Sequence, residues 1–478
     1  MAYPAFPLTG SSSSMRKRPA LYALIQSVVA TLLALSGIST AFAQAAPRAP
    51  ELTLSQAVDT ALQKNPLRKA GQADSMASQA DVRAARSLFM PRLSFSEAAT
   101  HGNDPVYVFG SKLRQQRFTT IDFALNKLNT PLPFGNFATR FGASWNLFDS
   151  FATWRGIARS QQMSKAANYQ LDRTEQEIIF RVISAYYQVL LAQKELDISE
   201  KSVNTGHAII EETQAKFDTG LVVESDLLTA RVRLAGRQQD LIRARNNLDL
   251  ARAQLNTAMG VTADSAFQVS ETLAERSLPL PVLQEVEKQA VTGRPDLKRI
   301  ESEEAAQRQS VSIAKSSFGP QIGAFAGWEL DNPTFVGGGG GNNWLGGIEV
   351  KFDIFDGGAK RAELSRQHAV HEKVLAMKQA AVDAVRLEVR RAYYDFDASK
   401  QQIEVARAAV AQAQESLRIS QDRYSGGLTT ITDLLSAEDA ARRSQTNYWD
   451  AIYRFHTSYA SLELASGSLT SQSPVVTP

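Results

Sequence analysis

The stretch KFDTGLVVESDLLTA at residues 216–230 recurs as RYSGGLTTITDLLSA at residues 423–437, which is 207 residues further along the chain. Gly220 and Gly427 are typical of a helix C-terminus, where a residue with positive φ often ends the helix. The following Ser225-Asp226 and Thr432-Asp433 pairs offer oxygens that can cap the next helix. One copy alone would fit an ordinary helical hairpin. Two copies at matched positions predict the tips of a duplicated structure.

Long stretches without proline lead into both tips, from about Arg155 to Phe217 and from Lys360 to Tyr424. About 63 helical residues would span roughly 95 Å, which is longer than a compact domain, so each helix must lie along neighbouring helices. In the returning segment, leucine recurs every seventh residue from Leu227 to Leu255. Alanine follows three positions after most of these leucines, and Arg237 is the exception. This pattern predicts a left-handed supercoil with closely packed helices.

Two short helices are expected at the start of each repeat. In the first repeat, Thr53 and Gln56 have the spacing of a capping box. Prolines 66 and 91 then end the two helices, and prolines 295 and 320 do the same in the second repeat. Both pairs of prolines are 229 residues apart, so the two repeats share this arrangement.

Four segments after these helices alternate between apolar and polar residues, which predicts β-strands at residues 92–100, 140–147, 321–330 and 347–355. The repeat offset falls from 229 to 207 across them, so the first strand pair carries 22 additional residues, in the loop 101–139. This loop joins the strand ends that face away from the helices, and we expect it to be extracellular. Trp145, Trp328 and Trp344 lie near strand ends, where the aromatic belt of a membrane protein would be.

The N-terminus has the features of a secretory signal peptide. Arg16-Lys17-Arg18 is followed by a mostly apolar stretch and by Ala41-Phe42-Ala43, so we expect cleavage before Gln44. An uncleaved anchor is the alternative. The chain lacks cysteine, which excludes disulfides, thiolate metal sites and a lipid-modified cysteine. With 52 basic and 49 acidic residues, its charge gives no indication of nucleic-acid binding.

The expected fold is mainly α-helical with a small β part, built from two repeats. Four strands cannot close a barrel, and an open edge is not viable in lipid, so several copies would have to contribute strands. Two copies would give eight strands and three would give twelve, enough for a lumen. The predicted divisions are a signal peptide (1–43), first-repeat helices (44–91), a strand hairpin (92–148), a helical hairpin (149–260), a linker (261–281), second-repeat helices (282–320), a strand hairpin (321–355), a helical hairpin (356–466) and a flexible tail (467–478).

From Leu52 to Gly467 the chain resembles the TolC family of outer-membrane efflux and secretion channels. The duplicated tips and the Phe-Asp dipeptide before each long helix carry this resemblance. The resemblance implies a homotrimer with a coiled-coil α-barrel in the periplasm and a 12-stranded transmembrane β-barrel surrounded by outer-membrane lipid. It also implies that small molecules or proteins leave a Gram-negative cell with the help of a periplasmic adaptor and an inner-membrane pump of RND or ABC type.

The resemblance also implies that the tips contact the adaptor and close the periplasmic entrance. An aspartate–tyrosine hydrogen bond of the family corresponds to Asp226 and Tyr424. The position of a basic partner is Thr429 here, and one of two acidic positions is Ser436. The implied gate residues are Ser225, Asp226, Tyr424, Thr429, Asp433 and Ser436, and the implied adaptor contacts are Lys216, Phe217, Gly220, Leu221, Val222, Arg423, Tyr424, Gly427 and Leu428.

A soluble periplasmic coiled-coil adaptor is the competing interpretation, because such proteins also carry long helical hairpins. The four strands and the duplication are not required by an adaptor, and they favour the channel. The sequence shows no catalytic constellation, so we expect neither an enzyme nor a cofactor. His368 and His371 have a helical spacing that suits a metal, but they lack a third ligand.

Overall fold

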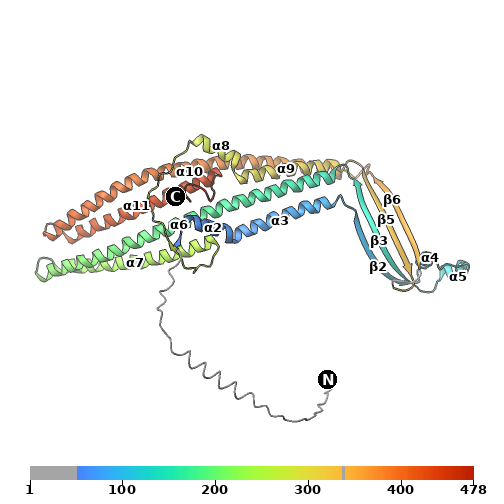
Figure 1. Ribbon diagram of the computed structural model, residues 1–478, viewed down its shortest axis with the longest axis horizontal. Coiled ribbons are helices and arrows are strands. Elements are labelled where there is room, and N and C mark those ends of the chain that lie inside the picture. Colours follow the sequence, from blue (N-terminus) through green and yellow to red (C-terminus); the bar gives the residue numbers. More distant parts are fainter. Residues whose placement is uncertain (1–50, 336–339, 478) are drawn as a thin grey trace, which may run out of the picture. The chain divides into compact units, whose positions relative to one another are not determined.

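The computed structural model describes residues 51–335 and 340–477 (Figure 1). The predicted signal peptide, residues 1–43, lies outside these residues, as does part of the glycine run in the second strand hairpin. None of the helices in the described ranges is both long enough and apolar enough to cross a membrane.

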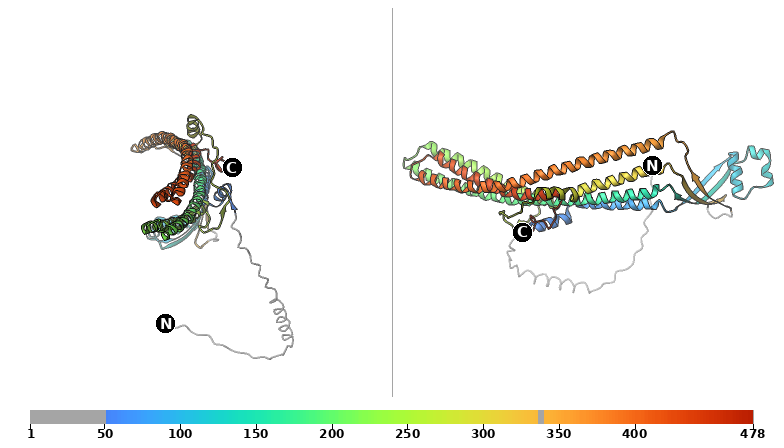
Figure 2. Two further views of the ribbon diagram at one scale, coloured as in Figure 1. Left: turned by 90° about the vertical axis from the view of Figure 1, so that its left-hand side faces the viewer. Right: turned by 90° about the horizontal axis from the view of Figure 1, so that it is seen from above.

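Two helical hairpins of equal size form most of the fold. The first consists of α6 (Ala152–Asp218) and α7 (Glu224–Met259), and the second of α10 (Ala359–Ser425) and α11 (Ile431–Ser466). The long helix has 67 residues and the returning helix 36 residues in both hairpins. Seen end-on, these helices follow one curved layer, and both tips lie at the same end of it (Figures 1 and 2).

Shorter helices lie along the other half of each long helix. They are α2 (Leu54–Lys64) and α3 (Pro66–Ser87) in the first repeat, and α8 (Leu283–Gly293) and α9 (Pro295–Ser316) in the second. Thr53 and Gln56 form the predicted capping box at the start of α2. Helices α3 and α9 both pack on α6, and α9 also packs on α10. The prediction that the long helices lie along neighbours is therefore confirmed.

The sheet contains β2 (Arg92–Gly102), β3 (Phe134–Phe148), β5 (Gln321–Asn332) and β6 (Gly341–Lys351), antiparallel and in that order. Its register places most apolar side chains on one face. Four aromatic residues stand directly opposite one another in one row across all four strands of this apolar face: Phe95, Phe141, Trp328 and Trp344. The opposite, polar face carries Arg92, Ser94, Arg140, Ser144, Asn146, Gln321, Glu329, Glu349 and Lys351, together with the apolar Phe325 and Leu345.

The last strand lies earlier in the chain than predicted, because β6 begins at Gly341 and ends at Lys351, whereas the prediction was residues 347–355. Lys351 pairs with Gln321, the first residue of β5, and the preceding Pro320 has no N–H with which to extend the ladder. Phe352, Ile354 and Phe355 therefore continue as exposed, unpaired chain toward α10.

The predicted loop 101–139 is shorter than expected and partly helical. Strand β2 continues to Gly102 and β3 begins at Phe134. Between them lie α4 (Pro105–Arg114), the 3-10 helix η1 (Thr120–Phe123) and α5 (Leu125–Asn129). The Asp104 side chain accepts a hydrogen bond from the Tyr107 N–H, with 2.8 Å between N and O, and Pro105 occupies the first helical position. Both are helix-start signals that sequence analysis could have used.

The main hydrophobic core lies where α2 and α8 meet the four hairpin helices. Strand β4 (Gln268–Val269) of the inter-repeat linker pairs in parallel with β1 (Glu51–Leu52) at this level. The prediction of a flexible tail at 467–478 is wrong. Leu469, Val475 and Val476 are at most 1% exposed and belong to the core. Their burial removes apolar surface from water, which outweighs the polar composition of the segment.

Candidate functional site at the hairpin tips

Both tips turn through the same backbone geometry. At the first tip Gly220 has φ of +74°, and the Leu221 N–H donates to the Lys216 carbonyl, with 2.8 Å between N and O. Gly427 takes the same place in the second tip with φ of +73°. Glycine adopts this left-handed conformation without steric cost, so the predicted role of both glycines is confirmed.

The helices that leave the tips are capped differently. Thr430 and Asp433 form a capping box at the start of α11, in which each side chain accepts a hydrogen bond from the backbone N–H of the other. The matched residue before α7 is Val223, which has no side-chain oxygen. The prediction that Ser225-Asp226 caps α7 is wrong, because both residues lie inside its first turn. The sequence shows the oxygens of Ser225 and Asp226, but it does not show that the cap position, with its extended backbone, is Val223.

The other gate residues of the second tip are engaged locally. The Asp433 carboxylate also accepts the hydroxyls of Thr430 and Thr429, at O–O distances of 2.8 and 2.9 Å. These hydrogen bonds, with that from Thr430 foremost, lower the pKa of Asp433. Ser436 donates to the Thr432 carbonyl within its own helix at 2.7 Å. Asp433 and Ser436 are exposed and Thr429 is half-buried.

Tyr424 is buried between the two hairpins, with 2% of its surface exposed. Its hydroxyl lies 2.9 Å from the Thr213 hydroxyl of α6. Thr213 donates its only hydroxyl proton to the Ile209 carbonyl at 2.7 Å, so Tyr424 must be the donor to Thr213. Burial raises the pKa of Tyr424, so the phenol stays protonated. The resemblance implied a hydrogen bond between Tyr424 and Asp226. Within the described chain, Tyr424 instead bonds Thr213.

Lys216 holds the same tyrosine from another side. Its ammonium group lies 3.8 Å from the centre of the Tyr424 ring and donates to the Tyr424 carbonyl. It also pairs with Glu212 at 3.1 Å, and Glu212 accepts a hydrogen bond from Ser425 at 2.9 Å. Two predicted adaptor contacts, Lys216 and Tyr424, thus point into the chain, and this arrangement ties the end of α6 to the end of α10.

A small apolar cluster completes the contact between the tips. It draws on both hairpins and is separate from the main core. Its buried members are Ile209 and Ala230 of the first hairpin and Tyr424, Ile431, Leu434 and Leu435 of the second. The two tips are therefore packed against each other within one chain.

Apolar side chains also point outward from the tips. Leu221 is 75% exposed, Val223 is 63% exposed and Leu428 is 72% exposed. Phe217 is exposed at the end of α6, and Val222 is half-buried. Arg423 is exposed as well, so the surface of the tips combines apolar and basic groups. Such residues at the end of a hairpin form a surface to which a partner can bind.

A buried ion pair, which we call the hairpin latch, joins the hairpins further from the tips. Arg237 of α7 donates to Glu438 of α11, and these side chains are 4% and 5% exposed. The Ser202 hydroxyl of α6 donates to the second carboxylate oxygen at 3.0 Å. Burial raises the pKa of Glu438, and the Arg237 guanidinium opposes this effect. Sequence analysis missed Glu438, although Arg237, the charged exception among the alanines, was the signal that could have found it.

More exposed ion pairs flank the latch between the same two helices. Arg233 lies 3.3 Å from Asp439, and Arg442 lies 4.0 Å from Asp240. In the described ranges, no group of three or more His, Cys, Asp or Glu side chains is placed to hold a metal ion. The charged groups of the latch and of these flanking pairs make contacts between helices.

These features define a class of protein: a duplicated chain whose paired helical hairpins end in matched tips and whose opposite end carries a sheet with one apolar and one polar face. Comparison with known proteins identifies the class. The model of the outer membrane efflux protein family matches residues 57–261 and 286–468. The chain belongs to this family, the TolC-family outer membrane factors.

Individual proteins agree with this assignment. The chain is 23% identical to nodulation protein T of Rhizobium leguminosarum bv. trifolii over 393 residues, covering 81% of this chain and 80% of that one. It is 24% identical to the outer membrane protein TolC of Escherichia coli K12 over 344 residues, covering 68% of each chain. Its fold matches the outer membrane channel CmeC of Campylobacter jejuni with a TM-score of 0.73, at 17% identity, over 88% of this chain and 87% of that one.

Family membership establishes the general role. The chain is an outer-membrane exit duct for efflux or type I secretion in a Gram-negative bacterium, and it has a large periplasmic part. The family consists of channel and transport proteins. A soluble periplasmic adaptor is the interpretation that these findings do not favour.

Proposed function

We propose that three copies of this chain assemble into one channel, in which twelve strands form a transmembrane barrel and the long helices form a periplasmic tube. The observation that carries this proposal is the two-faced sheet with unpaired outer edges. In the described residues, β2 and β6 each pair with one strand only, and an unpaired edge cannot be exposed to lipid. The strands alternate in direction, so β6 of one copy can pair antiparallel with β2 of the next.

The distribution of aromatic residues supports a membrane position for the sheet. The row from Phe95 to Trp344 crosses all four strands on the apolar face. A second aromatic group lies where the helices meet the sheet, with Phe89 and Trp154 in edge-to-face contact at 5.1 Å. Aromatic girdles at both interfaces are typical of transmembrane barrels. The curved layer of the hairpin helices would likewise continue into a tube by the same symmetry (Figure 2).

The exposed tip residues support contact with a periplasmic adaptor, and through it with an inner-membrane pump. Leu221, Val223 and Leu428 project from the end of the hairpins that lies farthest from the sheet (Figure 1). An apolar patch rimmed by polar residues suits a helical partner. In this arrangement the tips also form the gate, which opens when the contacts between hairpins separate. A hydrogen bond between Asp226 and Tyr424 across this gate would require the Tyr424 hydroxyl to leave Thr213.

Native mass spectrometry in mild detergent tests the assembly. We expect a trimer, and a chain that is only monomeric or dimeric would contradict the proposal.

The adaptor surface is tested by Leu221→Asp and Leu428→Asp in a strain that depends on this channel for drug resistance. We expect resistance to fall while the trimer persists, because a carboxylate on an apolar contact must be desolvated without a partner. The matched control is Leu125→Asp in α5, a residue that is 76% exposed at the opposite end of the chain. Resistance that survives both tip substitutions would exclude this surface as the adaptor contact.

A further inference from the structure

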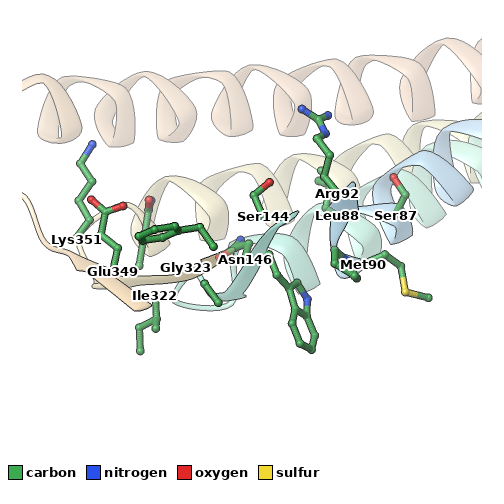
Figure 3. Close-up of a pocket in the computed structure, with 15 residues that line it drawn as sticks. Ser87, Leu88, Met90, Arg92, Ser144, Asn146, Ile322, Gly323, Glu349 and Lys351 are labelled. Atoms are coloured by element: carbon green, nitrogen blue, oxygen red, sulfur yellow. The ribbon is translucent and has the colours of Figure 1, made fainter. Parts of the chain in front are cut away.

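The polar face of the sheet carries isolated cations at its end nearest the helices. Arg92 is the first residue of β2 and Lys351 is the last residue of β6. Both point to the same side of the sheet as Ser144 and Glu349, whereas Ile322 points to the other side (Figure 3). These polar residues line a hollow of about 710 Å³, to which Phe325 adds an apolar wall.

Unlike Arg140 of the same face, neither of these two cations is neutralised by an ion pair among the described residues. Across residues 51–335 and 340–477, no carboxylate lies within 4 Å of Arg92 or Lys351. Further along the same face, Arg140 pairs with Glu329 at 2.8 Å. Glu349 also lacks an ion-pair partner in the part of the chain that the structure describes, so Arg92, Lys351 and Glu349 together leave one net positive charge per chain at this level.

Closure of the barrel would bring these cations together from different chains. Strands β2 and β6 are the two outer strands of the sheet, so in a closed barrel β6 of one copy would lie beside β2 of the next copy. Arg92 and Lys351 both occupy the end of their strand that joins the helices, and both face the polar side. We propose that Arg92 and Lys351 of the three copies form a cationic ring, here called the junction ring, that binds anionic groups of molecules passing through the lumen. The proposal rests on the trimer proposed above.

The chemistry of the ring suits carboxylates and phosphates attached to an apolar body. The Arg92 guanidinium can donate two parallel hydrogen bonds to such an anion, and Lys351 supplies a compact charge beside it. The Phe325 ring lies against Gly347 of the neighbouring strand, where a Cβ would come within 3.0 Å of it. This close contact holds an apolar surface next to the cations, and amphipathic organic anions are therefore the expected ligand class.

The expected size of the effect follows from the barrel geometry. Twelve strands spaced about 4.8 Å apart and tilted by about 40° enclose a backbone cylinder of roughly 12 Å radius. Side chains reach inward, so the net charges would lie about 8 Å from the axis, where three of them enrich monovalent anions about threefold at 0.1 M salt. The ring should therefore alter ion selectivity measurably without blocking flow.

Reversal potentials in planar bilayers under a KCl gradient test the ring. The double variant R92Q/K351Q changes the net charge at this level from +1 to −1 per chain, so we expect the chloride-to-potassium permeability ratio to fall at least about ninefold. Glu349→Gln should raise the ratio. Half-block of the current by citrate, used as the anionic probe, should require a higher concentration in R92Q/K351Q. The control is Lys127→Gln in α5, which removes an exposed charge outside the sheet and should leave the ratio unchanged.

The outcomes separate the ring from the assembly. A trimeric, conducting R92Q/K351Q channel with the selectivity and citrate block of the unmodified protein would overturn the junction ring and leave the trimer intact. Failure of the unmodified chain to form a trimer or to conduct would overturn the proposed function itself.

Discussion

Breaking the hairpin latch should open the channel. Glu438→Ala leaves the Arg237 guanidinium buried without its counter-charge, while its Nε already lacks a hydrogen-bond partner among the described residues. Breaking a buried ion pair by removing one partner costs about 3–5 kcal/mol. Since the latch joins α7 to α11, this cost falls on the state in which the hairpins are packed together. An equilibrium between packed and separated hairpins would shift by a factor of roughly 10² to 5 × 10³ in favour of separation.

The double variant Arg237→Leu/Glu438→Leu distinguishes lost charge pairing from lost packing. Replacing both members of a buried ion pair by apolar residues is often neutral or stabilising, so the double variant should restore most of the closed population. Two assays report on this: the open probability of single channels in planar bilayers, and hydrogen exchange of α7. Glu438→Ala should raise both, and the double variant should return both toward the values of the unmodified protein.

Two glycines provide a matched control. A Cβ on Gly206 would lie 2.8 Å from a guanidinium nitrogen of Arg237, whereas a Cβ on Gly236 would have nothing within 4 Å. Gly206→Ala should therefore disturb the latch and raise the open probability. Gly236→Ala should leave gating unchanged and stabilise α7 by up to about 1 kcal/mol through helix propensity. The reasoning would be refuted if Glu438→Ala showed the same hydrogen exchange of α7 and the same open probability as the unmodified channel. It would also be refuted if the open probability of Arg237→Leu/Glu438→Leu were as high as that of Glu438→Ala.

Further predictions concern the tips, the core and the loop. Tyr424→Phe removes a hydrogen bond worth about 1 kcal/mol and should raise single-channel conductance; unchanged conductance would leave Tyr424 a packing residue only. Burial lowers the pKa of His456 to about 4 and raises that of Glu463 to about 7, so their contributions to stability change in opposite directions between pH 4.5 and 6.5. In urea unfolding, Glu463→Gln should make stability rise with pH over this range and His456→Phe should make it fall, and parallel profiles would contradict this. Val475→Asp should lower stability by about 3–5 kcal/mol, seen as a lower Tm, because the carboxylate would be buried without a partner. The loop between β2 and β3 joins the strand ends that lie away from the helices, so we expect it outside the cell; a tag inserted at Asn129 should be labelled on intact cells, and labelling only after permeabilisation of the outer membrane would reject this topology.

Local periodicity made much of the fold predictable. The change from helical to alternating patterns located the four strands, and the matched prolines located the shorter helices. The tip glycines were predictable because their backbone conformation is restrictive and local. These predictions needed only neighbouring residues, whose spacing reflects which face of an element is buried.

Contacts between distant segments were not predictable in the same way. The tail was taken as flexible because its composition is polar, yet Val475 and Val476 fill a place in a core formed by residues far away in the sequence. Tyr424 bonds Thr213, which is 211 residues away, and no local pattern specifies that partner. Arg237 was noticed as an exception, but the identity of its partner depends on how α7 and α11 lie against each other.

The unequal caps of the two tips have a consequence for how the duplicated halves have diverged. A side-chain cap is worth about 1 kcal/mol, so the first turn of α7, which begins after Val223, should fray roughly five times more often than that of α11, which begins after Thr430. Helix α11 begins with a capping threonine, whereas α7 begins after an apolar residue that faces solvent. Gene duplication thus supplied two versions of one turn, and each could be selected for a separate task. The capped start of α11 suits a fixed position, and the uncapped start of α7 suits local adjustment to a bound partner.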